Sequence, residues 1–138
     1  MNETSDKDLM EMCKQYDIQC HGCFVPDELT ELKKGNYIIN LNGQSHWCGL
    51  ICDDTCCYFD SFGFPPNEQL IDMMKDYVYN PYNIQALPSS SCGFYVVAFL
   101  KWMKGKKDKE KSFQLFLEQF VNKLRDNEII LASMLDAV

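Results

Sequence analysis

Apolar residues recur at helical spacing near the start of the chain, where Leu9 and Tyr16 fall on one predicted face. Ser5 stands where the N-cap of this helix belongs, and Asp8 follows it by three residues, the spacing of a capping box. The pattern therefore predicts a short N-terminal helix. A second short helical turn is expected from Pro26, because proline is favoured in the first turn of a helix.

Strand-forming residues dominate three segments in the first half of the chain. Residues 37–41 end at the turn signal Asn42-Gly43 and predict a core strand. The stretches His46–Cys52 and 55–61 flank Asp53-Asp54, so together they predict a β-hairpin.

The second half of the chain changes mainly to helical periodicity. Residues 68–77 predict a helix, and residues 82–87 predict a further strand. Residues 92–103 are apolar nearly all round, which is typical of a buried central helix. A last amphipathic stripe occupies residues 112–124, and residues 127–138 predict either a final helix or a docking tail.

Length, composition and charge narrow the classes of function. A chain of 138 residues can form one domain that buries roughly 65 to 70% of its unfolded surface, but it is too short for two. Its 46% hydrophobic and 24% charged residues are typical of a soluble globular protein. A formal net charge of -7 argues against nucleic acid as an obligatory partner, because phosphate binding requires clustered Lys and Arg. We expect residues 1–138 to form a single domain.

The start of the sequence is polar, and no apolar run approaches the roughly 18 to 20 residues that a membrane span needs. Neither a signal peptide nor a membrane anchor is therefore expected. The expected location is intracellular, with no membrane partner.

Eight cysteines are many for this length, and without a signal peptide we expect reduced thiols rather than a disulfide framework. Cys20-His21-Gly22-Cys23 could supply half of a zinc site. The other half would have to come from cysteines that lie within apolar strand patterns and are explained as small buried hydrophobes: Cys48, Cys52, Cys56 and Cys57. We therefore expect no metal and no other cofactor.

Cys92 follows a serine-rich turn and begins the predicted buried helix. Unpaired backbone N–H groups and the helix dipole at such a position favour a thiolate, the nucleophilic form of cysteine. The same N–H groups can bind an oxyanion, and the adjacent Gly93 has no side chain to block close approach. The alternative is that Cys92 is one more small buried residue at the start of a helix.

His46 begins a predicted strand beside a turn, so its ring can face a helix N-terminus and act as general base toward the thiol. The only other histidine, His21, is expected at the surface. Asp60 ends the partner strand, where its carboxylate can hold the tautomer of His46 and stabilise the imidazolium. An ordinary strand-end cap explains Asp60 equally well.

The length of the hairpin turn decides whether these two side chains can meet. A two-residue turn at Asp53-Asp54 would set Asp60 opposite Trp47, which is the wrong face for His46. We therefore expect an odd-length loop or a bulge between Cys52 and Cys56, which would set His46 directly opposite Asp60.

Two further side chains are candidates for the site. Gln85 alternates with apolar residues, so its amide could donate to an oxyanion, although a surface glutamine is the ordinary alternative. Trp47, beside the predicted base, could form one wall of a narrow substrate slot suited to glycine, or could pack in the core.

The motifs that carry these residues resemble the adenain-like and SUMO-protease (Ulp) clan of cysteine peptidases. They are Ser45-His46-Trp47, Tyr58-Phe59-Asp60-Ser61-Phe62-Gly63 and Gln85-x6-Cys92-Gly93-x-Tyr95. The order His, Asp, Gln, Cys matches that clan and reverses the order in papain. The resemblance covers about residues 37–103 and is strongest to the small maturation proteases of double-stranded DNA viruses, virophages and related transposons.

This resemblance implies an α+β fold with a mixed central sheet flanked by helices, the adenain/Ulp-like or permuted papain-like arrangement. It implies Cys92 as nucleophile, His46 as base, Asp60 as the group that orients it, and Gln85 in the oxyanion hole. The implied substrate is a viral capsid or core precursor protein, cleaved near small residues such as a Gly-Gly pair. The implied location is the host cytoplasm or virus factory, and the virion.

The DNA and peptide activators of adenovirus proteases are not expected for this acidic chain on the sequence alone, and the need for an activating peptide stays open. Two other functions also stay open. One is a ubiquitin- or SUMO-like isopeptidase with the same four residues. The other is a non-catalytic binding module stapled by zinc.

Overall fold

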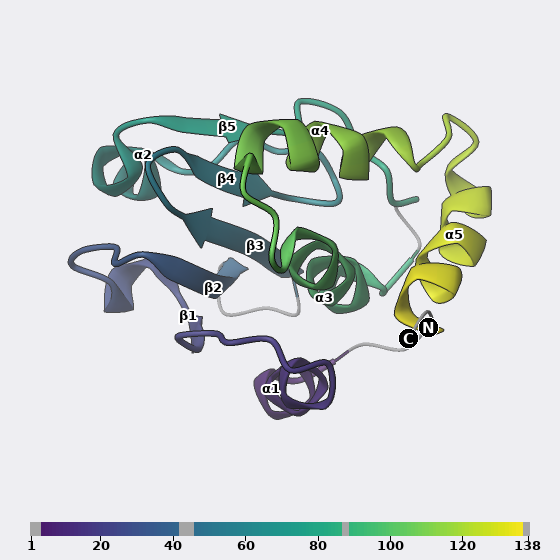
Figure 1. The fold of residues 1–138 in the computed structure, drawn as a ribbon, viewed down its shortest axis with the longest axis horizontal. Helices are drawn as coiled ribbons and strands as arrows, with labels where there is room; N and C mark the ends of the chain where they lie inside the picture. The colour runs from purple at the N-terminus through teal and green to yellow at the C-terminus, as the bar shows by residue number, and fades with distance from the viewer. Residues whose placement is uncertain (1–3, 42–45, 87–88, 137–138) are drawn as a thin grey trace.

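A mixed sheet of five strands, with helices on both faces, organises the computed structural model, which describes residues 4–41, 46–86 and 89–136 (Figure 1). The helical elements are α1 (Asp6–Gln15), the 3-10 turn η1 (Pro26–Glu28), α2 (Glu68–Met74), α3 (Cys92–Met103), α4 (Lys109–Glu118) and α5 (Leu124–Asp136). The strands are β1 (Cys23–Phe24), β2 (Gly35–Leu41), β3 (His46–Cys52), β4 (Cys56–Phe59) and β5 (Tyr77–Tyr79).

The strands lie side by side in chain order, from β1 to β5. The central pairs β2–β3 and β3–β4 are antiparallel, whereas the outer pairs β1–β2 and β4–β5 are parallel. This arrangement agrees with the predicted α+β class and mixed sheet. It also places β3, the strand that begins with His46, at the centre of the sheet.

One face of the sheet carries α1, α3, α4 and α5, and α3 lies directly against it (Figure 1). A Cβ on Gly49 of β3 would lie 2.7 Å from the Phe99 ring of α3, so the glycine permits this close packing. The opposite face is covered by η1 and α2, through buried residues such as Leu70. Alternate residues of β3 therefore point to different cores, with Trp47 toward α3 and Cys48 toward the opposite side.

Several predicted elements are present at their predicted positions. Ser5 caps α1, and the reciprocal hydrogen bonds between Ser5 and Asp8 form the predicted capping box. The β3 and α3 bounds match the predicted segments, and η1 is the predicted turn at Pro26. The C-terminal segment is a helix through Asp136 rather than a docking tail. The turn signal at residues 42–43 lies outside the described residues.

The prediction of a strand at residues 82–87 is wrong for residues 82–86, which the structure describes without a strand. The backbone N–H groups of Ile84 and Gln85 both donate to the carbonyl oxygen of Ser61, at 2.8 and 3.1 Å. The segment therefore wraps around the end of β4 instead of pairing with a neighbouring strand.

Two helical predictions need different bounds. The helix predicted for residues 68–77 ends at Met74, because Lys75 adopts a positive φ of 64°, and the chain then enters the unpredicted strand β5. The stripe at residues 112–124 is divided between α4 and α5. The Asn127 side chain stabilises the bend between them, since it accepts from Val121 N–H at 2.7 Å and donates to Val121 O at 2.9 Å.

Among the described residues, no helix combines the length and the apolar character that crossing a membrane requires.

Candidate active site

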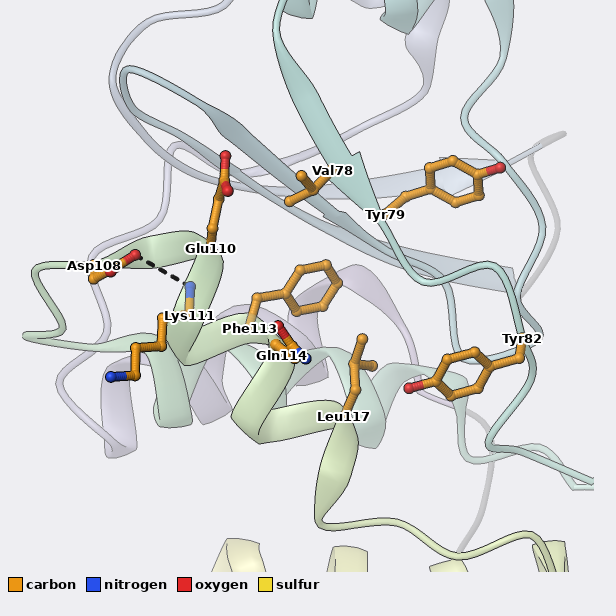
Figure 2. A pocket seen from close by; sticks show the side chains of 9 residues that line it. All are labelled: Val78, Tyr79, Tyr82, Asp108, Glu110, Lys111, Phe113, Gln114 and Leu117. Carbon is orange, nitrogen blue, oxygen red and sulfur yellow. Dashed lines mark hydrogen bonds between the residues drawn. The ribbon is translucent and has the colours of Figure 1, made fainter.

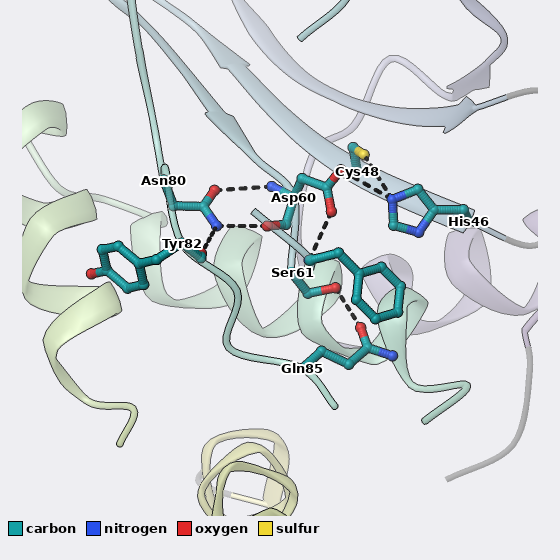
Figure 3. A network of polar contacts seen from close by, with 8 residues as sticks. His46, Cys48, Asp60, Ser61, Asn80, Tyr82 and Gln85 are labelled. Carbon is teal, nitrogen blue, oxygen red and sulfur yellow. Dashed lines mark hydrogen bonds and ion pairs between the residues drawn. The ribbon is translucent and has the colours of Figure 1, made fainter. Parts of the chain in front are cut away.

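His46 and Asp60 are in direct contact at one end of the central strands (Figure 3). His46 is the first residue of β3, and Asp60 directly follows β4. The Nε2 atom of His46 lies 3.0 Å from Oδ2 of Asp60, a hydrogen-bond and ion-pair distance. The Asp60 side chain is fully buried, whereas 21% of the His46 side chain is exposed. The predicted pairing of the two residues is thus present in the structure.

The Asp60 carboxylate is held in place by its neighbours. Its second oxygen, Oδ1, accepts from the backbone N–H of Phe62 at 2.8 Å. The Asn80 side chain clamps the Asp60 main chain, accepting from Asp60 N–H at 3.1 Å and donating to Asp60 O at 2.6 Å (Figure 3). Asn80 also donates to Tyr82 O at 3.1 Å. The carboxylate is therefore held toward His46 by two sets of hydrogen bonds. One comes from the Phe62 N–H, and the other joins the Asn80 side chain to the Asp60 main chain.

The hairpin between β3 and β4 has the predicted odd-length connection, residues 53–55. The register differs from the predicted one, however. Gly49 pairs with Phe59, so an extension by one residue sets Asp60 opposite Cys48 rather than opposite His46. His46 and Cys48 point to the same side because they are two residues apart on a strand, and His46 therefore reaches Asp60 diagonally.

Cys92 is the first residue of α3, as predicted, and is only 5% exposed. Its thiol makes a side-chain hydrogen bond with the His46 ring. The ring therefore contacts both the buried carboxylate and the thiol, although the three residues come from different elements. The first turn of α3 contributes backbone N–H groups without intrahelical partners, the feature that can stabilise an anion beside Cys92.

The surroundings of His46 determine its protonation. Burial by itself would lower the pKa of the ring, but hydrogen bonds with Asp60, Cys48 and Cys92 outweigh it and raise the pKa to about 12. His46 is consequently an imidazolium at neutral pH. An imidazolium beside a cysteine sulfur is the arrangement that an attacking thiolate requires.

Cys48 is a neighbour of His46 that the sequence interpretation did not assign to the site. Its Sγ lies 3.8 Å from His46 Nε2, and the residue is fully buried (Figure 3). Burial raises the pKa of the Cys48 thiol to about 12. Ligand atoms of His46, Cys48 and Asp60 all lie within 4.8 Å of one another, so these three side chains could also hold a metal ion.

Gln85 is fully buried, and its amide is engaged on both sides. The Ser61 hydroxyl donates to Gln85 Oε1 (Figure 3), and Gln85 Nε2 donates to the carbonyl oxygen and the hydroxyl of Ser89, at 3.0 and 3.2 Å. Gln85 is thus not a surface glutamine. Its amide holds the turn that precedes Cys92, and donation to an oxyanion stays a prediction.

Glu128 of α5 anchors the serine-rich turn before Cys92. Its Oε1 accepts from the hydroxyls of Ser89 at 2.6 Å and Ser91 at 2.8 Å. Burial alone would raise the pKa of Glu128, but these hydrogen bonds hold it below the ordinary value. The last described helix, α5, is therefore connected to the turn before Cys92 through charge-assisted hydrogen bonds.

The N-terminal segment covers the two residues predicted to contact substrate. Trp47 is 4% exposed, and its indole N–H donates to the carbonyl oxygen of Thr4 at 3.1 Å. A Cβ on Gly93 would lie 2.0 Å from Thr4 Oγ1 and 3.0 Å from Leu9 Cδ2. Gly93 thus permits close approach, but by the protein's own N-terminal segment. The substrate roles of Trp47 and of the Gly93 N–H stay predictions.

Two pockets lie at different distances from these residues. One, of about 300 Å³, reaches Trp47 and lies between the N-terminal segment and the β1–η1 region; it includes Asp6 and Glu28. A second, of about 490 Å³, lies between β5 and α4 and includes Tyr79, Phe113 and none of the predicted catalytic residues (Figure 2). Trp47 is thus the predicted site residue that lines the first pocket, whereas His46, Asp60 and Cys92 line neither of the two.

Four residues of the site were missed by the sequence interpretation, for different reasons. Cys48 could have been found, because strand alternation from His46 puts it on the same face. Asn80 lies between the predicted helix of residues 68–77 and the predicted strand of residues 82–87, where no site residue was expected, and Ser89 was interpreted only as part of a turn. Glu128 has no local signal, because its role depends on α5 packing beside the turn before Cys92.

Comparisons with known proteins support the fold alone. No protein-family model matches the sequence, and no curated protein matches it either. One solved structure with a similar fold is the central domain of the uncharacterized protein Lpg1148 from Legionella pneumophila, with 14% identity and a TM-score of 0.51. The match covers 98% of this chain and 94% of that chain. The α+β architecture is therefore shared along nearly the whole length of both.

Proposed function

We propose that this protein is a cysteine endopeptidase in which Cys92 is the nucleophile, His46 the acid and base, and Asp60 the residue that orients His46. The observation that carries the proposal is the His46 ring, which contacts the Asp60 carboxylate at 3.0 Å and the Cys92 thiol. The order of the motifs and the mixed sheet support an adenain/Ulp-like form of the fold.

The proposed reaction proceeds through an acyl-enzyme. The Cys92 sulfur attacks the scissile carbonyl carbon and forms a C–S bond, while backbone N–H groups at the start of α3 stabilise the oxyanion. The His46 imidazolium then donates its proton to the leaving amine as the C–N bond breaks. The neutral His46 next accepts a proton from water, whose oxygen attacks the thioester carbonyl carbon; the C–S bond breaks, and the Cys92 thiolate and the His46 imidazolium are regenerated.

The proposed substrates are viral capsid or core precursor proteins, cleaved beside small residues such as Gly-Gly. The motif resemblance supports the substrate class. The preference for small residues is also proposed from this resemblance. The proposed place of action is the host cytoplasm or virus factory, and the virion.

The first test is competition among the cysteines for a limiting amount of iodoacetamide, followed by peptide mapping. Cys20 and Cys23 are partly exposed whereas Cys92 is 5% exposed, so exposure alone predicts that Cys92 reacts after them. We expect Cys92 to react first, and His46→Ala to remove that preference. Slow reaction of Cys92 in both proteins would contradict the proposed role.

The second test is cleavage of peptides that carry Gly-Gly, with matched peptides in which one glycine is replaced by valine. We expect cleavage of the Gly-Gly peptides only, with loss of activity in Cys92→Ala and retention in the matched control Cys23→Ala. Electrophilic ubiquitin and SUMO probes separate the endopeptidase from the isopeptidase. Labelling of Cys92 by those probes, without peptide cleavage, would favour the isopeptidase.

A further inference from the structure

We propose that His46, Cys48 and Asp60 form a zinc-binding site, and that zinc bound there switches off the hydrolase. Their side chains provide an imidazole nitrogen, a thiol sulfur and a carboxylate oxygen, the three donor types that bind Zn²⁺ in proteins. Zinc binding does not depend on the proposed function. Inhibition by zinc rests on the proposed function, because inhibition requires His46 to be catalytic.

The two donor separations from His46 Nε2 are close to those of a tetrahedral zinc site. Bond lengths of about 2.0–2.2 Å to N and O and about 2.3 Å to S imply N···O and N···S separations of about 3.4 and 3.6 Å around the metal. The observed separations are 3.0 Å between His46 Nε2 and Asp60 Oδ2, and 3.8 Å between His46 Nε2 and Cys48 Sγ. The third separation, between Cys48 Sγ and an Asp60 oxygen, is within 4.8 Å, and side-chain motion would bring it to the roughly 3.6 Å of a tetrahedral site.

The three residues are positioned by the fold rather than by one flexible loop. His46 and Cys48 are two residues apart on β3 and share a face of the sheet. Asp60 follows β4, and its other oxygen is held by the Phe62 N–H at 2.8 Å. An outer hydrogen bond of this kind orients a metal-binding carboxylate. Three protein ligands leave the fourth position of the tetrahedron open.

A buried hydroxyl beside Cys48 is placed to support a charged sulfur. Tyr58 is fully buried and lies beside Cys48. Among the described residues, its hydroxyl is one of the few buried side-chain oxygens that lack a hydrogen-bond partner. A metal-bound Cys48 thiolate would accept a hydrogen bond from this hydroxyl, as ligands commonly do from outer groups.

Zinc at this position would stop the proposed reaction because it occupies the Nε2 atom through which Asp60 orients His46. The bound cation takes the place of the Nε2 proton and makes the ring a weaker base. The exposed part of the His46 side chain gives the ion a route inward, since Cys48 and Asp60 are fully buried.

The test is metal binding by the full chain after removal of metal with a chelator. Zn²⁺ is titrated against a chromophoric competitor, and Co²⁺ is added in parallel because thiolate ligation produces a cobalt charge-transfer band. We expect one equivalent to bind wild type and Cys23→Ala, the matched control in the Cys20–Cys23 segment. Cys48→Ala should weaken binding by more than the roughly 10- to 100-fold that loss of an outer partner costs, and should remove the band.

Cys48→Ser keeps the size of the side chain and serves if Cys48→Ala does not fold. Equal affinity in wild type and a folded Cys48 variant would overturn the zinc site. Binding that is lost in Cys23→Ala would place the metal in the Cys20–Cys23 segment and would also overturn it.

Inhibition is measured on Gly-Gly peptides as a fraction of each protein's own metal-free rate. We expect one equivalent of Zn²⁺ to inhibit wild type reversibly and Cys48→Ala only at much higher concentration. Zinc bound at the site without inhibition would overturn the switch. Absence of hydrolysis in every metal-free protein would instead count against the proposed peptidase, while the binding data still decide the zinc site.

Discussion

The Asp60 carboxylate is a fully buried charge, which is costly unless both oxygens have partners. His46 satisfies one oxygen and the Phe62 N–H satisfies the other, at 3.0 and 2.8 Å. The same contact keeps a proton on His46. At the scale of single residues, the hydrogen bond between His46 and Asp60 therefore has two effects. It pairs the buried carboxylate, and it holds the imidazole in its protonated form.

The protonation of His46 can be followed by NMR of its ring in a His21→Gln background, where one histidine remains. The hydrogen bond with Asp60 and those with Cys48 and Cys92 raise its pKa from an ordinary 6.5 to about 12 against the effect of burial, so no titration is expected between pH 5 and 8. Asp60→Asn should return the midpoint to that range. Because the folded pKa is raised, the proton stabilises the fold fully below about pH 6.5, and this contribution is lost as the pH rises toward 12. A midpoint near 6.5 in both proteins would contradict this account.

Asn80 is expected to act on the site through the Asp60 backbone. Asn80→Ala removes the bonds with Asp60 N–H, Asp60 O and Tyr82 O, and should lower the free energy of unfolding by about 1–3 kcal/mol because buried groups are left unsatisfied. Urea unfolding measures the loss. Asn80→Asp keeps only the oxygen that accepts from Asp60 N–H. An unchanged free energy of unfolding in both variants would show that the Asn80 side chain does not hold the Asp60 backbone.

At the scale of secondary-structure elements, the N-terminal segment packs against the start of α3. Thr4 and α1 lie over the first turn of α3, and Gly93 is the residue that leaves room for them. On the other side of Cys92, α5 holds the preceding turn through Glu128. Cys92 is therefore placed by contacts from both ends of the chain as well as by its own helix.

Gly93→Ala tests the fit of the N-terminal segment. The new methyl group would lie 2.0 Å from Thr4 Oγ1, so overpacking should lower the free energy of unfolding by about 1–3 kcal/mol. Thr4→Gly in the same protein removes the clashing side chain and should restore much of this loss, while Thr4→Gly alone serves as the control. An equal loss with and without Thr4 would show that another contact is responsible.

Glu128→Ala tests the link from α5 to Cys92. Loss of the carboxylate frees the hydroxyls of Ser89 and Ser91, and misplacement of the nucleophile should lower kcat on Gly-Gly peptides by about 10- to 100-fold. As a positioning residue, Glu128 should leave the pH dependence of His46 unchanged, and Glu128→Gln should recover part of the rate. A shifted His46 midpoint in the NMR titration would contradict a role confined to position.

At the scale of the whole molecule, the sheet separates two cores that both contain cysteines. Cys13 and Cys57 belong to the core beneath α3, while Cys48, Cys52 and Cys56 belong to the core on the opposite face. All eight cysteines are free thiols, and these five are buried. Their accessibility to reagents thus reports on the integrity of both cores.

A chromogenic disulfide reagent should therefore react with three thiols in the native protein and with all eight in denaturant. The three are Cys20 and Cys23, which are partly exposed, and Cys92, if it is the activated nucleophile. Mass mapping identifies the sites. Rapid reaction of Cys48 or Cys57 in the native protein would mean that the cores open far more readily than their packing implies.

Predictions from the sequence succeeded where the signal was local. The capping box at Ser5, the bounds of β3 and the start of α3 at Cys92 follow from residues within a few positions. The strand predicted at residues 82–87 failed because a long-range acceptor, the Ser61 carbonyl, took the N–H groups that a strand would have used. The short strand β5 was missed because it pairs with β4, some 20 residues earlier in the sequence.

The sequence by itself determined the chemical types at the site and the elements that carry them: a histidine at a strand start, an acid at the next strand end and a cysteine at a helix start. Only the tertiary structure decided which of these side chains contact one another. It set the diagonal register from His46 to Asp60, turned the Gln85 amide toward Ser89, and put Thr4 over Gly93. The physical reason is that capping and periodicity depend on near neighbours, whereas these contacts depend on how whole elements pack across the sheet.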